Sequence, residues 1–450
     1  MLYMANSVFD PDMENIRRNI RALMDTKKII GSYTLRSKDI PLVSFDLTVE
    51  LQQALGMVQR KYQVHIRQTN PDAGSLFPRA LRDNLTDDAL QKWIEHRKAP
   101  KNRQFVDHLL DSIEDRNNPF RYMDVSHALS LNDALWITND AVPAKWADWN
   151  LYHHPFNEIL AYVAFTGYST KVSGVVTSPE LTSSGTLKKC WSNRDDGIYL
   201  IKGDDLTATT DGRSQAVMEY YASQVAEAMK IPYVPYDLEL FRHQNGRQEV
   251  VCKSQLFTSE DVGFVPAYDF FLDHNLPLDE TDPADLLLQE QMATIYGMEA
   301  YQDLMVFDVL IGNRDRHLGN FGYLIDNNTG KYLRPAPVFD NGFSLLVGAS
   351  RQDLEEKNFL YYISHIIQGK WFDFPMQAKL FAQPRHQAVM RKLEDFTFQK
   401  HPDDNLTDSI LKQMNRFVQY QARLVLQTIR GKRRSTMDLS KVGKDKGFHP

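Results

Sequence analysis

The chain has 450 residues, with 52 lysines and arginines against 58 aspartates and glutamates, so its formal net charge is −6. This balance excludes a polycationic protein that coats nucleic acid without specificity. The two cysteines, Cys190 and Cys252, exclude a disulfide-stapled scaffold and a cysteine-rich zinc fold. The N-terminus lacks the apolar core of a signal peptide, and no apolar run is long enough to span a membrane. We therefore expect a soluble, cytoplasmic protein of two or three domains, without membrane insertion.

Residues 1–160 mix strand and helix signals, and we predict that they form an N-terminal accessory domain. Residues 42–49 and 62–67 alternate apolar and polar side chains like half-buried strands. Residues 86–97 begin with acidic residues and carry apolar side chains on one face, which is typical of a helix. A basic stretch overlaps its end and is made of His96, Arg97, Lys98, Lys101 and Arg103. We interpret this stretch as a solvated turn, with a binding patch as the alternative.

The pattern after residue 160 predicts a β-rich small lobe over residues 161–260 and a helical large lobe over 261–430. In the small lobe the expected order is strand, loop, strand, helix, strand, strand. These elements are predicted at 172–177, 178–191, 198–203, 213–229, 236–242 and 249–257. Residues 431–450 are basic and contain glycine, so we expect a flexible tail there.

The stretch 308–346 holds the polar residues with the clearest chemical meaning. Asp315 precedes Asn320 by five residues, and a predicted hairpin separates them from Asp340, which stands in an Asp-Asn-Gly sequence. Phosphoryl transfer needs a carboxylate that orients or accepts the proton of the attacking hydroxyl, and oxygen ligands for the Mg²⁺ that bridges the nucleotide phosphates. Asp315 suits the first role, and Asn320 and Asp340 suit the second.

The nucleotide phosphates also need a cation, and Lys202 on a predicted strand is the candidate. Glu219, in the helix that follows, is the leading acid to orient this lysine. A lone lysine at a strand end is more often a surface residue. Its place ahead of Glu219 and of the 308–346 motifs favours the catalytic role.

Four sequence segments resemble HipA-like kinases, which are bacterial serine/threonine kinases known as toxins of toxin–antitoxin pairs. The segments are NRDRHLGN, FDNG, YLIKG and MEYYASQVAEAMKIPYVPY. The motif RDRH-x-x-N is also similar to the catalytic loop of phosphatidylinositol 3- and 4-kinases, to which HipA-like folds are related. The resemblance covers residues 165–425 and is most specific within 308–342.

The resemblance implies a role for each candidate residue. Asp315 would be the catalytic base, Asn320 and Asp340 would bind Mg²⁺, and Lys202 would contact the ATP phosphates while Glu219 orients it. ATP and Mg²⁺ are the implied cofactors, and a serine or threonine of a protein is the implied acceptor. A separately encoded antitoxin is an implied partner, and DNA would be reached only through that partner.

One departure from the kinase patterns concerns the phosphate-binding loop. The sequence contains neither G-x-G-x-x-G nor G-x-x-x-x-G-K-[ST], so we expect the loop at 178–189 instead. HipA-like kinases are similar in using a small polar loop, and some of them are autophosphorylated on one of its serines. The expected phosphate contacts are Ser183, Ser184 and Gly185, the autophosphorylation candidates are Ser183, Ser184 and Thr186, and the added charge would come from Lys188 or Lys189. A flexible hairpin loop without such a role is the alternative.

The nucleotide base is expected near the connection between the lobes, at residues 255–258, with Gln255 and Phe257 as contacts. Cys252, on the strand before this connection, is expected to be a buried apolar residue. In the catalytic loop we expect His317 to brace the backbone. Arg314 and Arg316 are open between phosphate contacts and ion pairs within the loop.

Together these features predict an α/β, bilobal, protein-kinase-like fold with a mixed α/β N-terminal accessory domain and ATP bound between the lobes. The predicted function is Mg-ATP-dependent phosphorylation of a hydroxyl, with serine or threonine of a protein as the leading acceptor. A lipid or small-molecule kinase is the first alternative, and a pocket of metabolite size would favour it. A catalytically silent nucleotide- or partner-binding module is the second, and the presence of Asp315, Asn320 and Asp340 weighs against it.

Overall fold

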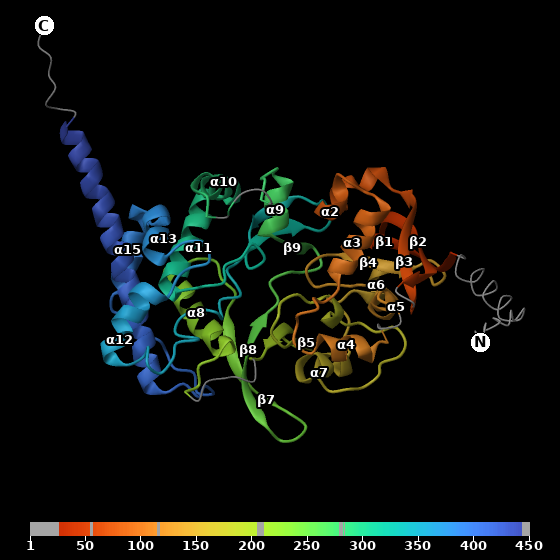
Figure 1. Cartoon of the computed structure of the whole chain (residues 1–450), viewed down its shortest axis with the longest axis horizontal. Helices are drawn as coiled ribbons and strands as arrows, with labels where there is room; N and C mark the ends of the chain where they lie inside the picture. Colours follow the sequence, from red (N-terminus) through yellow and green to blue (C-terminus); the bar gives the residue numbers. More distant parts are fainter. Residues whose placement is uncertain are drawn as a thin grey trace, which may run out of the picture.

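The structure is a computed structural model that describes residues 27–442 except 55–56, 115–117, 205–210, 279–281 and 283. The fold is mixed α/β, and its three sheets are antiparallel. Figure 1 shows the N-terminal region at one end in orange, the C-terminal helices at the other end in blue, and green strands between them. Within the described ranges, no helix has both the length and the apolar character that a membrane span requires.

The N-terminal region is built on a four-stranded sheet in the order β3-β2-β1-β4. The strands are β1 (Lys28–Ser37), β2 (Ile40–Ala54), β3 (Met57–Thr69) and β4 (Leu135–Asn139). The helices are α2 (Arg79–Arg82), α3 (Asp87–Arg97), α4 (Val106–Ser112), α5 (Arg121–Ser126), α6 (Trp146–Trp149) and α7 (Glu158–Thr166), with 3₁₀ turns η1 (Pro71–Leu76) and η3 (Glu180–Thr182). The predicted strands and the predicted helix of this region are therefore present.

Local chemistry explains where α3 begins and which face it buries. The Thr86 side chain accepts a hydrogen bond from the backbone N–H of Ala89, as an N-cap residue does. Leu90 and Ile94 then fall on the buried face. The core that they join also contains Leu181, so it continues beyond the domain boundary predicted at residue 160.

The strand predicted at 172–177 is wrong, since this segment belongs to no sheet. The backbone N–H groups of Val172 and Val176 donate instead to the carbonyls of Ser112 and Val125, in α4 and α5. Both valines pack against the N-terminal core. Their alternation with polar residues reflects packing against helices, which sequence periodicity does not distinguish from a strand over so short a run.

The small lobe has a four-stranded sheet in the order β5-β6-β8-β7 and one long helix. The elements are β5 (Lys189–Arg194), β6 (Gly197–Lys202), α8 (Gln215–Met229), β7 (Tyr236–Arg242) and β8 (Gln248–Gln255). Ser214 caps α8 by accepting the N–H of Val217, and the apolar face of α8 packs in one core with helix α11 of the large lobe. Cys252 is buried beside Lys202 in the register of β8 with β6, as expected.

The large lobe combines a three-stranded sheet, in the order β11-β10-β9, with helices. Its elements are β9 (Val262–Pro266), α9 (Ala267–Asp273), α10 (Leu286–Tyr296), α11 (Met298–Ile311), β10 (Gly322–Asp326), β11 (Tyr332–Pro335), α12 (Glu356–Tyr361), η4 (Tyr362–Ile366), α13 (Phe374–Phe381), η5 (Pro384–His386), α14 (Gln387–Leu393) and α15 (Asp408–Val442). Helix α15 thus occupies the first part of the segment for which the sequence predicts a flexible tail. Residues 443–450 lie outside the described residues.

Candidate active site

A cavity of about 500 Å³ lies where the small lobe, the large lobe and the 178–189 loop meet. We call it the nucleotide cavity, after the ligand that the sequence predicts. Most of the residues that the sequence singles out line it: Ser183, Ser184, Gly185, Thr186, Lys202, Phe257, Asp315, Asn320 and Asp340. Gln255 lines a smaller cavity of about 60 Å³, which shares Lys202 and Phe257 with the larger one. Glu219 is buried behind Lys202.

Lys202, the last residue of β6, lies between two carboxylates. Its Nζ is 3.0 Å from Oε1 of Glu219 and 2.8 Å from Oδ1 of Asp340. Burial by itself would lower the pKa of Lys202, but the charges of Asp340 and Glu219 outweigh burial and hold the pKa well above its ordinary value. The ammonium therefore stays charged and fixed in direction at the wall of the nucleotide cavity.

The backbone around Asp340 adopts a conformation that the Asp-Asn-Gly sequence allows. Asp340 has a left-handed φ of +56°, and its N–H donates to the Tyr236 hydroxyl at 3.2 Å. The next N–H, from Asn341, donates to the second carboxylate oxygen of Glu219 at 2.7 Å. At Gly342 a Cβ atom would lie 2.7 Å from the first backbone carbonyl oxygen of α8, so no side chain fits. The two oxygens of the Glu219 carboxylate thus bind the Lys202 ammonium and the backbone of the Asp340 turn.

The Asp340 carboxylate stays ionised and open to the nucleotide cavity. Burial would raise its pKa, but the positive charges of Lys202, Lys189 and Arg316 outweigh burial and hold the pKa well below its usual range. The side chain keeps 38% of its surface exposed. It is therefore an anionic oxygen ligand with room beside it.

Arg316 ties the catalytic loop to the rest of the large lobe. Its guanidinium pairs with both carboxylate oxygens of Asp308 at 3.0 and 2.9 Å, and both residues are buried. It also donates to the carbonyls of Asn320 and Phe339 and to the side-chain oxygen of Asn341. The ion-pair role left open for Arg316 is thus the observed one, and it joins the loop to the Asp-Asn-Gly turn.

Two neighbours of this arginine also have structural contacts. Nδ1 of His317 accepts the backbone N–H of Gly319 at 3.0 Å, the bracing contact expected from the sequence. Arg314 donates to the carbonyl of Val347, and its guanidinium lies 4.2 Å from the ring centroid of Phe343. Arg314 is therefore held within its own lobe as well.

Asp315 and Asn320 are positioned by hydrogen bonds that do not use their side-chain oxygens. The Asp315 N–H donates to the Asn313 side chain at 3.0 Å, and the Asn320 amide nitrogen donates to the Asp315 carbonyl at 2.9 Å. The Asp315 side chain is 44% exposed, and Nζ of Lys370 lies 3.4 Å from its Oδ1. Lys370 is a neighbour that no sequence motif indicated.

The 178–189 loop is held by the N-terminal region through a buried arginine. The guanidinium of Arg103 donates to the Glu180 carboxylate at 3.2 Å and to the backbone carbonyls of Glu180 and Lys189 at 2.8 Å each. Arg103 and Glu180 are fully buried, although the sequence interpretation placed this basic stretch in a solvated turn. That interpretation is wrong for Arg103 and for Arg97, because each pairs with a distant carboxylate, and no periodic signal marks such a pair.

The residue after Arg103 adds a second contact to the same loop. The Gln104 N–H donates to the Thr186 carbonyl at 2.8 Å, and its side-chain oxygen accepts the N–H of Lys188 at 3.3 Å. Together these bonds fix both sides of the loop. The N-terminal region therefore forms part of the nucleotide cavity's support.

The hydroxyl-bearing residues of the loop differ in their exposure and in the hydrogen bonds that they make. The Ser183 hydroxyl donates to the Pro179 carbonyl and accepts from the Trp191 indole, both at 2.8 Å. Ser184 and Thr186 are exposed. Of the three autophosphorylation candidates, Ser183 is thus the one whose hydroxyl is already engaged.

The two lysines of the loop also differ. The Lys188 ammonium turns away to pair with Glu249 at 2.7 Å. Lys189 lines the nucleotide cavity and donates to the Ser184 carbonyl at 2.8 Å. Burial, helped by the positive charge of Lys202, lowers the pKa of Lys189 to about 7.

The donor set of the nucleotide cavity fits a magnesium–nucleotide complex. Among the described residues no group of three or more histidine, cysteine, aspartate or glutamate side chains could hold a metal on its own. Asp340 offers a carboxylate, and Asn320, whose amide nitrogen is already used, offers its amide oxygen. Mg²⁺ commonly binds one or two protein oxygens and takes its other ligands from water and phosphate.

Comparisons with known proteins add little to this geometry. No protein-family model and no curated protein matches the sequence. Among solved structures, the chain is similar to the crystal structure of the Helicobacter pylori proinflammatory kinase CtkA, at 16% sequence identity and a TM-score of 0.40. The similarity covers 54% of this chain and 91% of that chain. At this level the likeness assigns no activity to this chain.

Proposed function

We propose that the protein is a Mg-ATP-dependent kinase that transfers the γ-phosphate to a hydroxyl, with serine or threonine of a protein as the leading acceptor. One observation carries the proposal. A charged lysine is fixed between Glu219 and Asp340 at the wall of a cavity that also holds Asp315 and Asn320. Phosphoryl transfer relies on such positioned charges far more than on covalent chemistry by the protein.

Each residue has a role that its environment supports. Lys202 and Lys189 would bind phosphate oxygens, and Asp340 with Asn320 would hold Mg²⁺, which neutralises charge on the phosphates. Asp315, whose side chain is exposed at the cavity, would orient the acceptor hydroxyl and take its proton. Glu219 does not touch the nucleotide in this scheme; it positions Lys202 and the Asp340 turn.

The narrower assignment, a HipA-like toxin of a toxin–antitoxin pair, rests on the motif resemblance alone. Autophosphorylation of the 178–189 loop belongs to the same proposal. Ser184 and Thr186 are its better candidates, because their side chains are exposed whereas the Ser183 hydroxyl makes two hydrogen bonds. A phosphate there would add negative charge beside the nucleotide phosphates and slow the enzyme.

A small-molecule acceptor is the second candidate function, and one observation favours it. A further cavity of about 620 Å³ shares a wall with the nucleotide cavity, and this volume is typical of metabolite pockets. Such an enzyme would use the same catalytic groups on a different hydroxyl.

The test incubates purified wild-type protein and its Asp315→Asn variant with labelled Mg-ATP and a cell lysate. We expect the wild type to label at least one protein or metabolite, and Asp315→Asn to lose at least about 100-fold of that rate. Asp395→Asn, an exposed change elsewhere, serves as the control. Mass spectrometry of the same samples should find loop phosphate on Ser184 or Thr186 only in active proteins. Equal labelling by wild type and Asp315→Asn would overturn the proposal, as would no labelling at all.

A further inference from the structure

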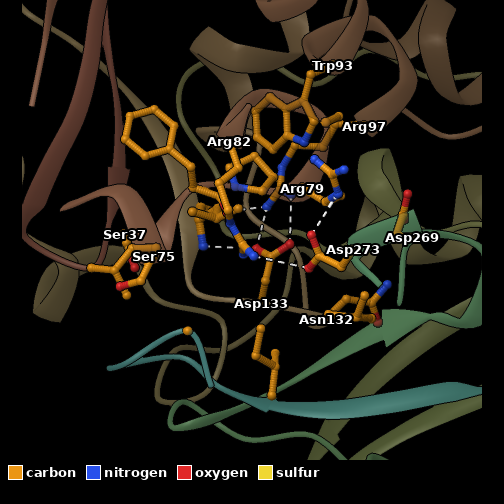
Figure 2. A pocket seen from close by; sticks show the side chains of 18 of the residues that line it. Ser37, Ser75, Arg79, Arg82, Trp93, Arg97, Asn132, Asp133, Asp269 and Asp273 are labelled. Atoms are coloured by element: carbon orange, nitrogen blue, oxygen red, sulfur yellow. Dashed lines mark hydrogen bonds and ion pairs between the residues drawn. The ribbon is translucent and has the colours of Figure 1, made fainter. Parts of the chain in front are cut away.

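The second cavity, which we call the chamber, lies between the N-terminal region and the large lobe (Figure 2). Its walls come from one face of α3, from β9 and α9, and from the hairpin of β10 and β11. It also adjoins the nucleotide cavity, because six residues line both: His96, Arg97, Asn132, Asp133, Phe264 and Pro266. A molecule in the chamber would therefore lie next to a nucleotide and to the cavity of Asp315.

One arginine of the chamber wall, Arg97, is neutralised by a carboxylate and held in place by further hydrogen bonds. Arg97 forms a two-pronged pair with Asp133, at 2.8 and 2.7 Å. Its Nε and Nη2 also donate to the carbonyls of Ala128 and Leu135 at 2.7 Å each. The guanidinium lies 5.0 Å from the ring centroid of Trp93, which fixes it further.

The other two arginines converge on one aspartate, as the dashed lines in Figure 2 show. Nε of Arg79 is 2.7 Å and Nη1 of Arg82 is 3.1 Å from the carboxylate of Asp273. Their terminal nitrogens also bind Asp83 and the Phe77 carbonyl. Nε of Arg82 makes no hydrogen bond but is buried, so a ligand cannot reach it. The charges of the two guanidinium groups are thus offset by Asp273 and Asp83, so this part of the wall carries little net positive charge.

Asp269 differs from the other carboxylates in this wall. It lies on α9 one turn before Asp273, and no hydrogen bond or ion pair reaches its carboxylate from the described part of the chain. Figure 2 shows it apart from the dashed ion pairs. Burial and the charge of Asp273 raise its pKa, although Arg79 opposes them. This half-buried carboxylate has no ion-pair partner within hydrogen-bond distance among the described residues, so its presence in a cavity suggests a ligand that neutralises it.

We propose that the chamber receives a cationic group of the acceptor substrate, an ammonium or a guanidinium, with Asp269 as its counter-ion. This inference rests on the proposed kinase function, because the shared wall makes the chamber an extension of the catalytic cavity. The cation can belong to a lysine or arginine side chain near the phosphorylated residue, or to a free amine that itself carries a hydroxyl. Because each arginine of the wall is already paired with a carboxylate, the wall does not favour an anionic group.

The first experiment measures substrate choice. Wild type and Asp269→Asn are assayed on serine peptide libraries in which one flanking position at a time is fixed as arginine or as citrulline, its neutral isostere. We expect the wild type to prefer arginine at one position by about tenfold, and Asp269→Asn to lose that preference with an unchanged KM for ATP. A parallel assay on ethanolamine, an amine with a hydroxyl, distinguishes a small acceptor from a peptide. No preference for a cation in the wild type, or the same preference in both proteins, would overturn the inference.

The second experiment does not depend on activity. Agmatine, which carries a guanidinium and an ammonium, is titrated into both proteins by calorimetry. We expect binding to the wild type and at least about tenfold weaker binding to Asp269→Asn, whereas the Asp395→Asn control binds like wild type. Asp269→Asn should be at least as stable as the wild type, because it removes a half-buried charge that has no ion-pair partner among the described residues. Agmatine binding that needs Asp269, in a protein that phosphorylates nothing, would keep the cation site and overturn the proposed function. Equal binding to both proteins would overturn the cation site.

Discussion

The nucleotide cavity and the chamber share a wall, yet their charged groups are used in opposite ways. In the nucleotide cavity, Lys189 donates to a backbone carbonyl, and Lys202 pairs with the buried Glu219 and with Asp340, a carboxylate that itself faces the cavity. In the chamber, Arg79 and Arg82 are bound to Asp273, whereas Asp269 has no partner among the described residues.

The difference shows that the number of basic residues in a cavity does not decide the charge of its ligand. What decides it is which charges remain unpaired after the protein's own ion pairs have formed. The chamber wall contains more arginines than the rest of the site but offers a carboxylate, while the nucleotide cavity offers cations whose pairs a phosphate can replace.

The largest expected effect of a single substitution is on the nucleotide cavity. Asp340→Asn should lower the rate of phosphate transfer by about 100-fold or more, because it removes the one cavity carboxylate held in an ionised state by Lys202. Steady-state kinetics at saturating Mg-ATP measure this loss, and circular dichroism checks that the variant is folded. The agmatine affinity should not change, since Asp340 does not line the chamber. Near-normal turnover would contradict the assignment of Asp340.

Most of the residues that line the nucleotide cavity and were singled out as site residues could be predicted from the sequence, because they belong to local motifs. Asp315, Asn320 and Asp340 lie within one stretch, and Lys202 and Glu219 belong to consecutive elements of the small lobe. Spacing and chain order therefore carried most of the information. The capped helix α8 and the strand β6 were likewise predictable from local signals.

The chamber and the support of the 178–189 loop were not predictable in this way. Arg103 meets Glu180 77 positions later, and Arg82 meets Asp273 across 191 positions. No periodic pattern links such residues, so a basic stretch with buried partners looks like a solvated turn. The false strand at 172–177 has the same origin, since its valines pack on helices far away in the sequence.

The next prediction tests whether the nucleotide cavity depends on contacts from the N-terminal region, which also forms a wall of the chamber. Arg103→Met leaves the Glu180 carboxylate buried without its cation, which typically lowers the free energy of unfolding by about 3–5 kcal/mol. It should also raise the KM for ATP, because the loop loses its anchor. Urea unfolding and steady-state kinetics measure the two effects. The double variant Arg103→Met, Glu180→Gln should recover part of the stability, and an unchanged KM in a folded Arg103→Met would argue that the loop is held without this pair.

The smallest effect concerns Lys189 and depends on pH. Its pKa is lowered to about 7 in the folded protein, so the side chain is protonated below that pH and neutral above it. Phosphate favours the protonated form, and nucleotide affinity should therefore fall as the pH rises from 6 to 9. Lys189→Met should remove this fall, which amounts to at most about tenfold per unit of pKa change on binding. Titration of the nucleotide's own phosphates is common to both proteins and cancels in the comparison.

The same lysine makes an independent prediction for stability. Between about pH 7 and the ordinary lysine value of 10.5, the unfolded chain binds a proton at this position that the folded protein does not. The free energy of unfolding contributed by Lys189 should therefore rise with pH across that window and be constant below it, where both states carry the proton. Urea unfolding at pH 7 and pH 9 should show the wild type gaining stability relative to Lys189→Met. Parallel curves for the two proteins would mean that Lys189 keeps an ordinary pKa, and the nucleotide cavity would then hold a permanent cation in place of one that titrates near neutrality.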